Sequence, residues 1–319
     1  MPQAGSPVQI SVALITRNRP DSLERCLKSV RSQNCQPFEI VVSDDSDPEF
    51  VAQTEAIAHA WGCRYVAGPH RGMQANRNQA HRHCQGTHIR TMDDDHEFPP
   101  QHFEVIQRVV EGDPASVWVF GEYLEWPTPD SVLHLPGEMQ PRGFRRPVQN
   151  PDDCFAISDG ATVYPRPIVT QHPFLEGLRY AGEAEYGARL KALGYRIRYC
   201  AETYIIHHTY NTPSAARLED KAVLTSSLFI GSYLTYSCYL PNGLKKWECL
   251  AYFWWRALRD AVQKSNPGAM DSASDRFSYD RLVSRPFQLG DFWRTWRLGM
   301  EYERLFQAGQ YEQMIRLQR

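Results

Sequence analysis

The first hundred residues alternate short apolar runs with segments in which apolar positions recur at helical spacing. The runs ISVALIT (10–16) and EIVVS (39–43) have the length and composition of buried strands. Between them, apolar positions repeat at helical spacing from Leu23 to Val30, after a helix-start signal at Pro20. The alternation continues with helices expected at 47–62 and 72–85 and a strand at 87–92. This order predicts a parallel sheet covered by helices on both faces, with ligands bound beyond the carboxyl ends of its strands.

The rest of the chain changes character twice. Residues 122–160 are rich in proline, glycine and polar side chains, and such a long irregular connection is a candidate binding loop. A helix is then expected at about 182–193, followed by strands at YRIRYC (195–200) and TYIIHH (203–208). From about 213 the pattern is helical, with five of the eight tryptophans. We therefore expect an α/β unit over 1–212 and a helical region over 213–319.

Composition narrows the class of protein. A hydrophobic content of 42% in 319 residues can fill a substantial core, and a net charge of −2 argues against a non-specific nucleic-acid binder. The eight cysteines form no CxxC pair, so we expect no zinc ribbon and no disulfide framework, and a reducing compartment fits best. The sequence has no run of 18 apolar residues and no signal-peptide pattern, so we expect no transmembrane helix and a cytoplasmic location.

Three consecutive aspartates follow the strand expected at 87–92. Because side chains alternate along a strand, Asp93 and Asp95 are expected on one face and Asp94 on the other. Adjacent carboxylates repel one another unless they are solvated or bind a cation, and carboxylate oxygens at a strand end suit Mg²⁺ or Mn²⁺ shared with a substrate phosphate. From the residues alone, a metal site and a plain acidic turn before the next helix are both good interpretations.

The helix at 72–85 carries polar residues on its apolar stripe, which includes Asn76 or Arg77. A polar residue in that position needs a partner. Arg77 either reaches a phosphate or nucleobase, or pairs inside the protein with one of the nearby aspartates. Asn78 has the same two interpretations.

Three segments together resemble the GT-A, family 2 type of inverting glycosyltransferase, over roughly residues 9–210. VALITRNRPDSLERCLKSVRSQ (12–33) is similar to the family's first strand and helix, and EIVVSDDSD (39–47) to its second strand with terminal acids. RGMQANRNQAHRHCQGTHIRTMDDDHEFPP (71–100) is similar to the stretch that ends in the DxD motif, although His88 and Arg90 interrupt a strand that is usually apolar. The resemblance implies a Rossmann-like, mainly parallel mixed sheet flanked by helices, with a helical C-terminal region.

The resemblance also implies roles for particular residues. Asp93 and Asp95 form the DxD pair, with Asp95 the direct ligand of a Mn²⁺ or Mg²⁺ ion that bridges the donor diphosphate. His207 resembles a histidine that approaches the metal or diphosphate, although a purely structural histidine is an equally good interpretation. UDP- or dTDP-sugars are the donors that the family favours. The donor-binding set expected on this basis is Thr16, Arg17, Asp44, Asp45, Arg77, Asn78, Asp93 and Asp94.

A general base is expected on the helix at 182–193. Glu183 shares one helical face with Tyr186 and Leu190 and therefore points inward. Glu185 lies off that face. Its simplest interpretation is structural, as a surface ion pair with Arg189, four residues later. By the resemblance, Glu183 replaces the family's usual aspartate and deprotonates the acceptor.

The segment SDGA (158–161) comes before this helix. Asp159 and Gly160 are candidates to line the acceptor pocket, where Asp159 would bind a hydroxyl, and a plain turn is the alternative.

The expected function is metal-dependent transfer of a sugar from a nucleoside-diphosphate donor to an acceptor hydroxyl, with inversion at the anomeric carbon. The acceptor is a glycan, a lipid-linked molecule or a small molecule. Two other functions remain open. The first is a sugar-phosphate nucleotidyltransferase, which also binds metal through aspartates, but TRNRPDS (16–22) is not the glycine-rich loop that such an enzyme normally carries. The second is a non-catalytic protein that binds nucleotide sugars.

The segment WECLAYFWWRALRDAVQ (247–263) mixes aromatic and cationic residues, in a region (213–319) with 15 Lys+Arg against 11 Asp+Glu. On a helix, Leu250, Trp254, Ala257 and Ala261 form one apolar stripe. Such a stripe usually packs against the catalytic domain or against a second subunit of a homodimer. The alternative is peripheral contact with an anionic membrane, at the inner face of the cytoplasmic membrane.

Overall fold

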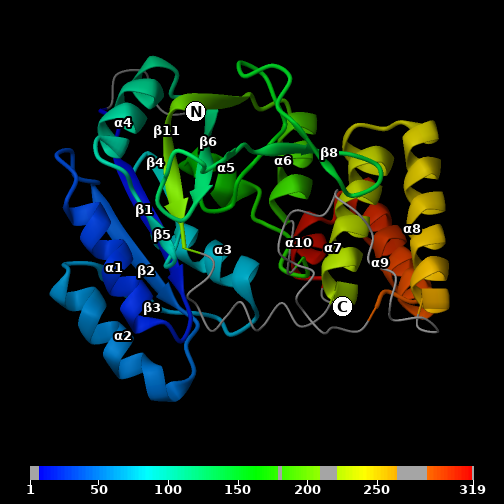
Figure 1. Ribbon diagram of the computed structural model, residues 1–319, viewed down its shortest axis with the longest axis horizontal. Coiled ribbons are helices and arrows are strands. Elements are labelled where there is room, and N and C mark those ends of the chain that lie inside the picture. The colour runs from blue at the N-terminus through cyan, green and yellow to red at the C-terminus, as the bar shows by residue number, and fades with distance from the viewer. Residues whose placement is uncertain (1–6, 179–181, 209–220, 264–285, 318–319) are drawn as a thin grey trace.

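The computed structural model describes residues 7–178, 182–208, 221–263 and 286–317. A mixed sheet of nine strands runs through it. Its strands are β1 (Ile10–Thr16), β2 (Glu39–Asp44), β3 (Arg64–Ala67), β4 (His88–Asp93), β5 (His96–Glu97), β6 (Val117–Leu124), β7 (Leu133–His134), β10 (Thr162–Pro165) and β11 (Ile197–His207). They are ordered β3-β2-β1-β4-β10-β6-β11-β5, and β7 pairs with β6 (Figure 1).

The sheet is mainly parallel, which confirms the predicted fold class. β1 pairs in parallel with β2 and β4, and β11 pairs in parallel with β6. β10 lies antiparallel between β4 and β6, so the long strands on either side of it still point the same way. The two strands expected at 195–200 and 203–208 are in fact one strand, β11, whose register shifts between Tyr199 and Tyr204.

Helices cover both faces of the sheet, as the alternating pattern predicts. They are α1 (Pro20–Arg31), α2 (Pro48–Ala60), α3 (Met73–His83), α4 (His102–Gly112), α5 (Arg166–Gln171) and α6 (Gly182–Ala192). On β1, Val12 and Leu14 belong to a core shared with α1 and α4, whereas Ala13 and Ile15 belong to a core shared with α3, α5 and α6. Because both faces are covered, the central residues Val12–Ile15 of the strand are all apolar.

The region 122–160, expected as a long binding loop, contains a small hairpin of β8 (Gly137–Met139) and β9 (Arg145–Pro147). The hairpin lies against α6 and the C-terminal helices (Figure 1). Its three-residue strands leave most of the segment irregular, so side chains of this region can reach several neighbouring elements.

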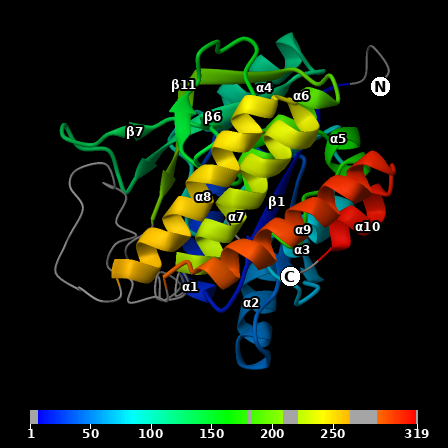
Figure 2. The ribbon, with the colours of Figure 1, turned by 90° about the vertical axis from the view of Figure 1, so that its right-hand side faces the viewer.

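The described C-terminal residues are helical. They form α7 (Lys221–Leu234), the π-helix η2 (Thr235–Tyr239), α8 (Gly243–Gln263), α9 (Leu289–Gln307) and α10 (Tyr311–Arg316). Figure 2 shows α7, α8 and α9 side by side at this end of the protein. Phe229 stacks on Phe253 and Phe292, with ring centroids 4.8 and 5.3 Å apart, and their core also includes Leu178 and Ala188. The boundary expected at residue 212 lies outside the described residues.

The helix expected at 247–263 is present within α8, but the apolar stripe assigned to it is wrong. Leu250 and Ala257 are buried together with Phe253, whereas Trp254 and Ala261 are exposed. Apolar residues occupy both sides of α8, and periodicity alone did not separate the packed side from the outer one. Within the part of the chain that the structure describes, no helix is long and apolar enough to cross a membrane.

Candidate active site

The carboxyl ends of β1, β2, β4 and β11 meet at one edge of the sheet. Their last residues are Thr16, Asp44, Asp93 and His207, and each is a residue that the sequence singles out. Because these strands run in the same direction, the four positions face the same region of space. The edge of the sheet predicted to bind a ligand is therefore the edge that gathers acidic and imidazole side chains.

Asp95, His96 and His207 form a group of potential metal ligands at this edge. Asp95 Oδ1 lies 3.6 Å from His96 Nε2 and 3.7 Å from His207 Nε2. The antiparallel pairing of β5 with β11 sets His96 directly opposite His207, which explains how two histidines distant in sequence meet. Within the described chain, Asp95 Oδ1 and His96 Nε2 are buried without a hydrogen-bond partner. Buried polar atoms without partners are costly, and a shared divalent cation would satisfy them.

The charges of this group depend on one another. Burial would raise the pKa of Asp95, but His207 and Arg19 hold it well below its ordinary value. Burial would lower the pKa of His207, but Asp95 and Glu122 raise it well above its ordinary value. Burial, together with His207, lowers the pKa of His96 to about 4, so this imidazole is neutral at neutral pH. A neutral imidazole is the form that binds metals, so a cation bound to this group would have to displace the proton from His207.

Asp94 is fully buried behind the edge. Its Oδ2 accepts hydrogen bonds from Thr16 Oγ1 at 2.6 Å and from Arg19 Nε at 3.1 Å. Arg19 Nη1 also lies 2.8 Å from Asp95 Oδ2. Burial raises the pKa of Asp94 to about 7, although Arg19 opposes the shift. Asp94 therefore positions Thr16 and Arg19 rather than facing a ligand itself.

Asp93 does not join the group around Asp95, contrary to the expected metal pair. Its carboxylate forms an ion pair with Arg77, 3.0 Å from Nη1. β4 ends at Asp93, so Asp93 and Asp95 do not share a strand face. The Arg77 guanidinium is fully buried and also donates to the Asp159 carbonyl at 3.0 Å. Of the two interpretations of Arg77, the structure has the internal ion pair.

Asn78 does not face the site, and the expectation that it binds the donor is not supported. Its side chain donates to the Phe174 carbonyl and accepts from the Phe174 amide, both at 2.9 Å. On α3 it points toward the segment after α5, because one residue on a helix turns the side chain by about 100°. Asn78 thus anchors that segment.

Asp44 and Asp45 remain at the sheet edge, as expected of residues near a nucleoside. Asp44 Oδ2 accepts a hydrogen bond from the Tyr65 hydroxyl at 3.0 Å, and Asp45 Oδ1 accepts one from the His70 amide at 2.7 Å. The Arg17 side chain is half exposed and pairs with Asp47 at 3.1 Å.

Asp159 and Gly160 form a turn beside the metal-ligand group. Asp159 Oδ2 accepts a hydrogen bond from Gln74 Nε2 at 2.9 Å, and burial raises the pKa of Asp159 although Arg77 opposes the shift. The Gly160 carbonyl accepts a hydrogen bond from Arg90 Nη1 at 2.8 Å. A Cβ atom at Gly160 would lie 2.5 Å from His96 Nδ1. Glycine is therefore what allows His96 to sit against this turn.

Glu183 opens α6 and is buried, as predicted. Its carboxylate pairs with Arg145 of β9. The Arg145 side chain is 41% exposed, so the ion pair is open to solvent on one side. Glu183 thus lies inside the protein but with a partner that faces the solvent.

Glu185 is not at the surface, contrary to expectation. The predicted ion pair with Arg189 exists, with Nε 2.8 Å from Oε1, but both side chains are buried. The Tyr239 hydroxyl donates a hydrogen bond to the same carboxylate at 2.6 Å. The C-terminal helices cover this side of α6 and turn a surface pair into an internal one.

Four residues of the site were missed by sequence reasoning: His96, Arg19, Arg145 and Arg90. His96 directly follows the aspartate run, which is a usable signal because a histidine next to a ligand aspartate is a candidate ligand. Arg145 lies inside the predicted binding loop, whereas its partner could not be read from the sequence. Arg19 and Arg90 are placed by the packing of the fold. The sequence carries no signal for Arg19, and for Arg90 it shows only a charged residue in a strand expected to be apolar.

Comparison with known proteins identifies the family. The family model described as glycosyl transferase family 2 matches residues 11–170. Among solved structures, S. aureus TarS residues 1–349 matches with a TM-score of 0.55 and 13% identity, over 96% of this chain and 89% of that one. The complex of the same protein with UDP-GlcNAc matches with a TM-score of 0.58.

GalNAc-T7 with UDP, GalNAc and Mn²⁺ matches with a TM-score of 0.58 and 14% identity, over 91% of this chain and 56% of that one. No curated protein sequence matches this chain significantly. At these identities the structural matches establish the fold, and the family model establishes the family. The nucleotidyltransferase and the non-catalytic binding protein that the sequence left open are accordingly disfavoured. The chain belongs to glycosyl transferase family 2, with the mixed α/β fold of its GT-A neighbours, and is a glycosyltransferase.

Proposed function

We propose that this enzyme transfers a sugar from a nucleoside-diphosphate sugar, with UDP- or dTDP-sugars favoured, to an acceptor hydroxyl with inversion at the anomeric carbon. The observation that carries the proposal is the convergence of Asp95, His96 and His207 at the sheet edge that also holds Asp44 and Asp45. The UDP-GlcNAc complex of TarS and the UDP complex of GalNAc-T7 support the donor class. Asp44 and Asp45, with the backbone around Thr16, are the proposed nucleoside contacts.

Asp95, His96 and His207 are the proposed holders of a divalent cation. One carboxylate and two imidazoles suit Mn²⁺ better than Mg²⁺, which prefers oxygen ligands. When bound, the cation would neutralise charge on the leaving diphosphate. Arg19 reaches Asp95 from the opposite side and is a second cationic group near the phosphates.

Glu183 is the proposed base. The neighbouring Arg145 guanidinium favours the ionised carboxylate, which is the form able to take a proton from an acceptor hydroxyl. Arg145 must then swing aside as the acceptor enters, and its solvent exposure allows this movement. Asp159 and Gly160 are the proposed residues on the acceptor side of the turn.

Two variants test this division of roles. Glu183→Gln should keep UDP affinity and lower sugar transfer by about 10²- to 10⁴-fold, the usual contribution of a positioned base. Asp95→Asn should lose the Mn²⁺ dependence of UDP binding, measured by calorimetry with Mn²⁺ and with a chelator. Equal UDP affinity of the unaltered protein in Mn²⁺ and in chelator, or a Mn²⁺ dependence that survives in Asp95→Asn, would show that the metal assignment is wrong. Full transfer activity in Glu183→Gln would show that Glu183 is not the base.

The C-terminal region (213–319) is proposed as a separate region that holds the enzyme at an anionic membrane surface. Five apolar residues form the outer face of α8: Leu244, Trp247, Trp254, Trp255 and Val262. Trp247 is 71% exposed and Leu244 is 85% exposed. Arg256 and Arg259 flank this face, and the Arg259 guanidinium lies 5.3 Å from the Trp255 ring centroid. Tryptophan with flanking arginine is the composition that suits an interface with anionic lipid.

Vesicle flotation tests the membrane contact. The protein should float with anionic vesicles, less so at high salt, and not with neutral vesicles. A Trp247→Ser/Trp254→Ser variant should not float. Phe38→Ser should float normally, because Phe38 is 50% exposed, close to the 45% of Trp254, but lies just before β2, away from α8 (Figure 1). A dimer by light scattering that the tryptophan variant abolishes, with no flotation of the unaltered protein, would assign the face to self-association instead.

A further inference from the structure

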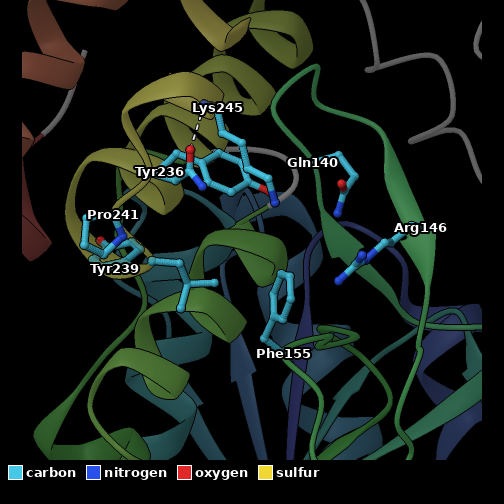
Figure 3. Close-up of a pocket in the computed structure, with 9 residues that line it drawn as sticks. Gln140, Arg146, Phe155, Tyr236, Tyr239, Pro241 and Lys245 are labelled. Carbon is cyan, nitrogen blue, oxygen red and sulfur yellow. Dashed lines mark hydrogen bonds between the residues drawn. The ribbon is translucent and has the colours of Figure 1, made fainter. Parts of the chain in front are cut away.

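A cavity of about 520 Å³ lies between the β8–β9 hairpin, the segment after it and the start of the C-terminal helices. Figure 3 shows that its walls come from different parts of the chain, with Gln140 and Arg146 on one side and Tyr236 and Lys245 on the other. It is separate from the sheet edge described above. The residues that line it are Gln140, Arg146, Phe155, Tyr236, Tyr239, Leu240, Pro241, Asn242 and Lys245.

The walls combine aromatic rings with amides, and so suit a saccharide. Phe155, Tyr236 and Tyr239 contribute aromatic rings, which pack well on the C–H faces of sugar rings. Gln140 and Asn242 contribute side-chain amides that can donate to and accept from hydroxyl groups. A few polar groups set among aromatic side chains are the usual composition of a small-molecule site.

Two cations make the cavity favourable for negative charge. Arg146 is held by Glu138, with Nε 2.8 Å from Oε2, so its guanidinium is fixed in direction. The Lys245 ammonium lies 5.1 Å from the Tyr236 ring centroid. No ion pair of Lys245 with another described residue is present. With two cations against the one carboxylate of Glu138, the local charge is positive.

Two contacts link the cavity to the proposed base. Arg145 and Arg146 are consecutive on β9, so their side chains point to opposite faces. Arg145 reaches Glu183, while Arg146 reaches the cavity. Tyr239 lines the cavity and binds Glu185 of α6, the helix that Glu183 opens. A molecule bound here would therefore contact the hairpin that holds Glu183, and it would contact Tyr239, which is bound to the helix that carries Glu183.

We propose that this cavity binds a saccharide unit carrying a phosphate or carboxylate group, as part of the acceptor. The aromatic rings hold the sugar, and Lys245 and Arg146 hold the anionic group. The assignment to the acceptor rests on the function proposed above, whereas the binding chemistry rests on the cavity alone.

Calorimetric titration with four probes tests the ligand class: glucose 6-phosphate, glucuronate, glucose and inorganic phosphate. Each titration is done without and with saturating UDP and Mn²⁺. In the second case UDP occupies the donor site and keeps the probes out of it. The two anionic sugars should bind, and glucose and phosphate should each bind about tenfold or more weakly. If glucose binds as tightly as glucose 6-phosphate, the proposal that the cavity recognises an anionic group is wrong. If inorganic phosphate binds as tightly as glucose 6-phosphate, the proposal that the cavity recognises a sugar is wrong.

Variants locate the binding. Lys245→Gln should weaken both anionic sugars by about 10- to 100-fold, as expected for loss of one charged hydrogen bond. Lys245 is only partly buried and forms no ion pair with another described residue, so this variant should fold normally. Arg142→Gln is the matched control, because Arg142 lies in the same hairpin but pairs with Glu248 outside the cavity lining. Unchanged affinity in Lys245→Gln would overturn the proposal. Failure of UDP to bind with Mn²⁺ would instead reject the proposed reaction and leave the cavity result standing.

Discussion

Replacing Gly160 by alanine should disturb the metal-ligand group although all three of its residues stay unaltered. The added Cβ would lie 2.5 Å from His96 Nδ1 and closer still to Cε1, whereas ordinary contacts begin at 3.4 Å. The ring and the turn must therefore separate by about 1 Å or more. The turn is tied down, because the Gly160 carbonyl accepts a hydrogen bond from the buried Arg90. His96 has little room either, since it is 2% exposed and its ring meets that of His207 at 4.5 Å.

The Gly160→Ala substitution should lower both the free energy of unfolding and the affinity for the metal. Overpacking of a buried site costs about 1–3 kcal/mol, which sets the expected loss in the free energy of unfolding. A shift of His96 also moves Nε2 away from Asp95 Oδ1, now 3.6 Å apart. Disturbing the groups that orient a metal ligand costs about 10- to 100-fold in affinity. We therefore expect Mn²⁺ affinity to fall by this factor in protein that is still folded.

The two effects are measured separately. Urea unfolding gives the stability, and calorimetric titration with Mn²⁺ in the presence of UDP gives the affinity. Gly112→Ala is the control, because a Cβ there meets nothing within 4 Å. If Gly160→Ala binds Mn²⁺ as tightly as the unaltered protein, His96 is not held by this turn or is not a ligand. If Gly112→Ala lowers Mn²⁺ affinity equally, the effect is not local.

Two further predictions concern buried titratable groups. Burial, aided by Arg77, lowers the pKa of His81 to about 3, so below about pH 6.5 the unfolded chain binds a proton that the folded protein does not. The free energy of unfolding should therefore fall as the pH drops from 6.5 toward 3. Relative to the unaltered protein, His81→Phe should be more stable by about 2 kcal/mol at pH 5 but not at pH 7.5, measured by urea unfolding. If stability falls equally with pH in both proteins, the assignment to His81 is wrong. Glu185→Gln should cost about 3–5 kcal/mol of stability, because it leaves the Arg189 guanidinium buried without its carboxylate, while transfer per folded molecule stays normal. A fully stable but inactive Glu185→Gln would mean that Glu185, not Glu183, is the base.

The sheet could be predicted from the sequence because its strands are buried on both faces. Every residue of β1 is buried, and its central residues Val12–Ile15 are all apolar. β11 was harder, because residues 201 and 202 are exposed and polar character there resembles a break between two strands. The strand continues through them by a shift in register, which neighbouring strands allow and which periodicity does not reveal.

The metal-ligand group could be predicted only in part. Asp95 and His207 come together because Asp95 closely follows β4 and His207 ends β11, two strands that run in the same direction, and strand ends are visible in the sequence. His96 joins them through the pairing of the two-residue strand β5 with β11, a contact between segments about a hundred residues apart. Strand alternation placed Asp93 on the same face as Asp95. In the structure the chain turns after Asp93, and the Asp93 carboxylate forms an ion pair with Arg77.

The choice between the two glutamates of α6 shows where helical periodicity stops being informative. Periodicity separates an inner from an outer face, but α6 lies between the sheet and the C-terminal helices, and its residues from 182 to 190 are all buried. What distinguishes Glu183 from Glu185 is the partner. Glu185 is held by Arg189 of the same helix and by Tyr239, both buried, so its carboxylate has no route to a substrate. Glu183 is held by an exposed arginine on a short hairpin, and only such a partner can be exchanged for an incoming hydroxyl.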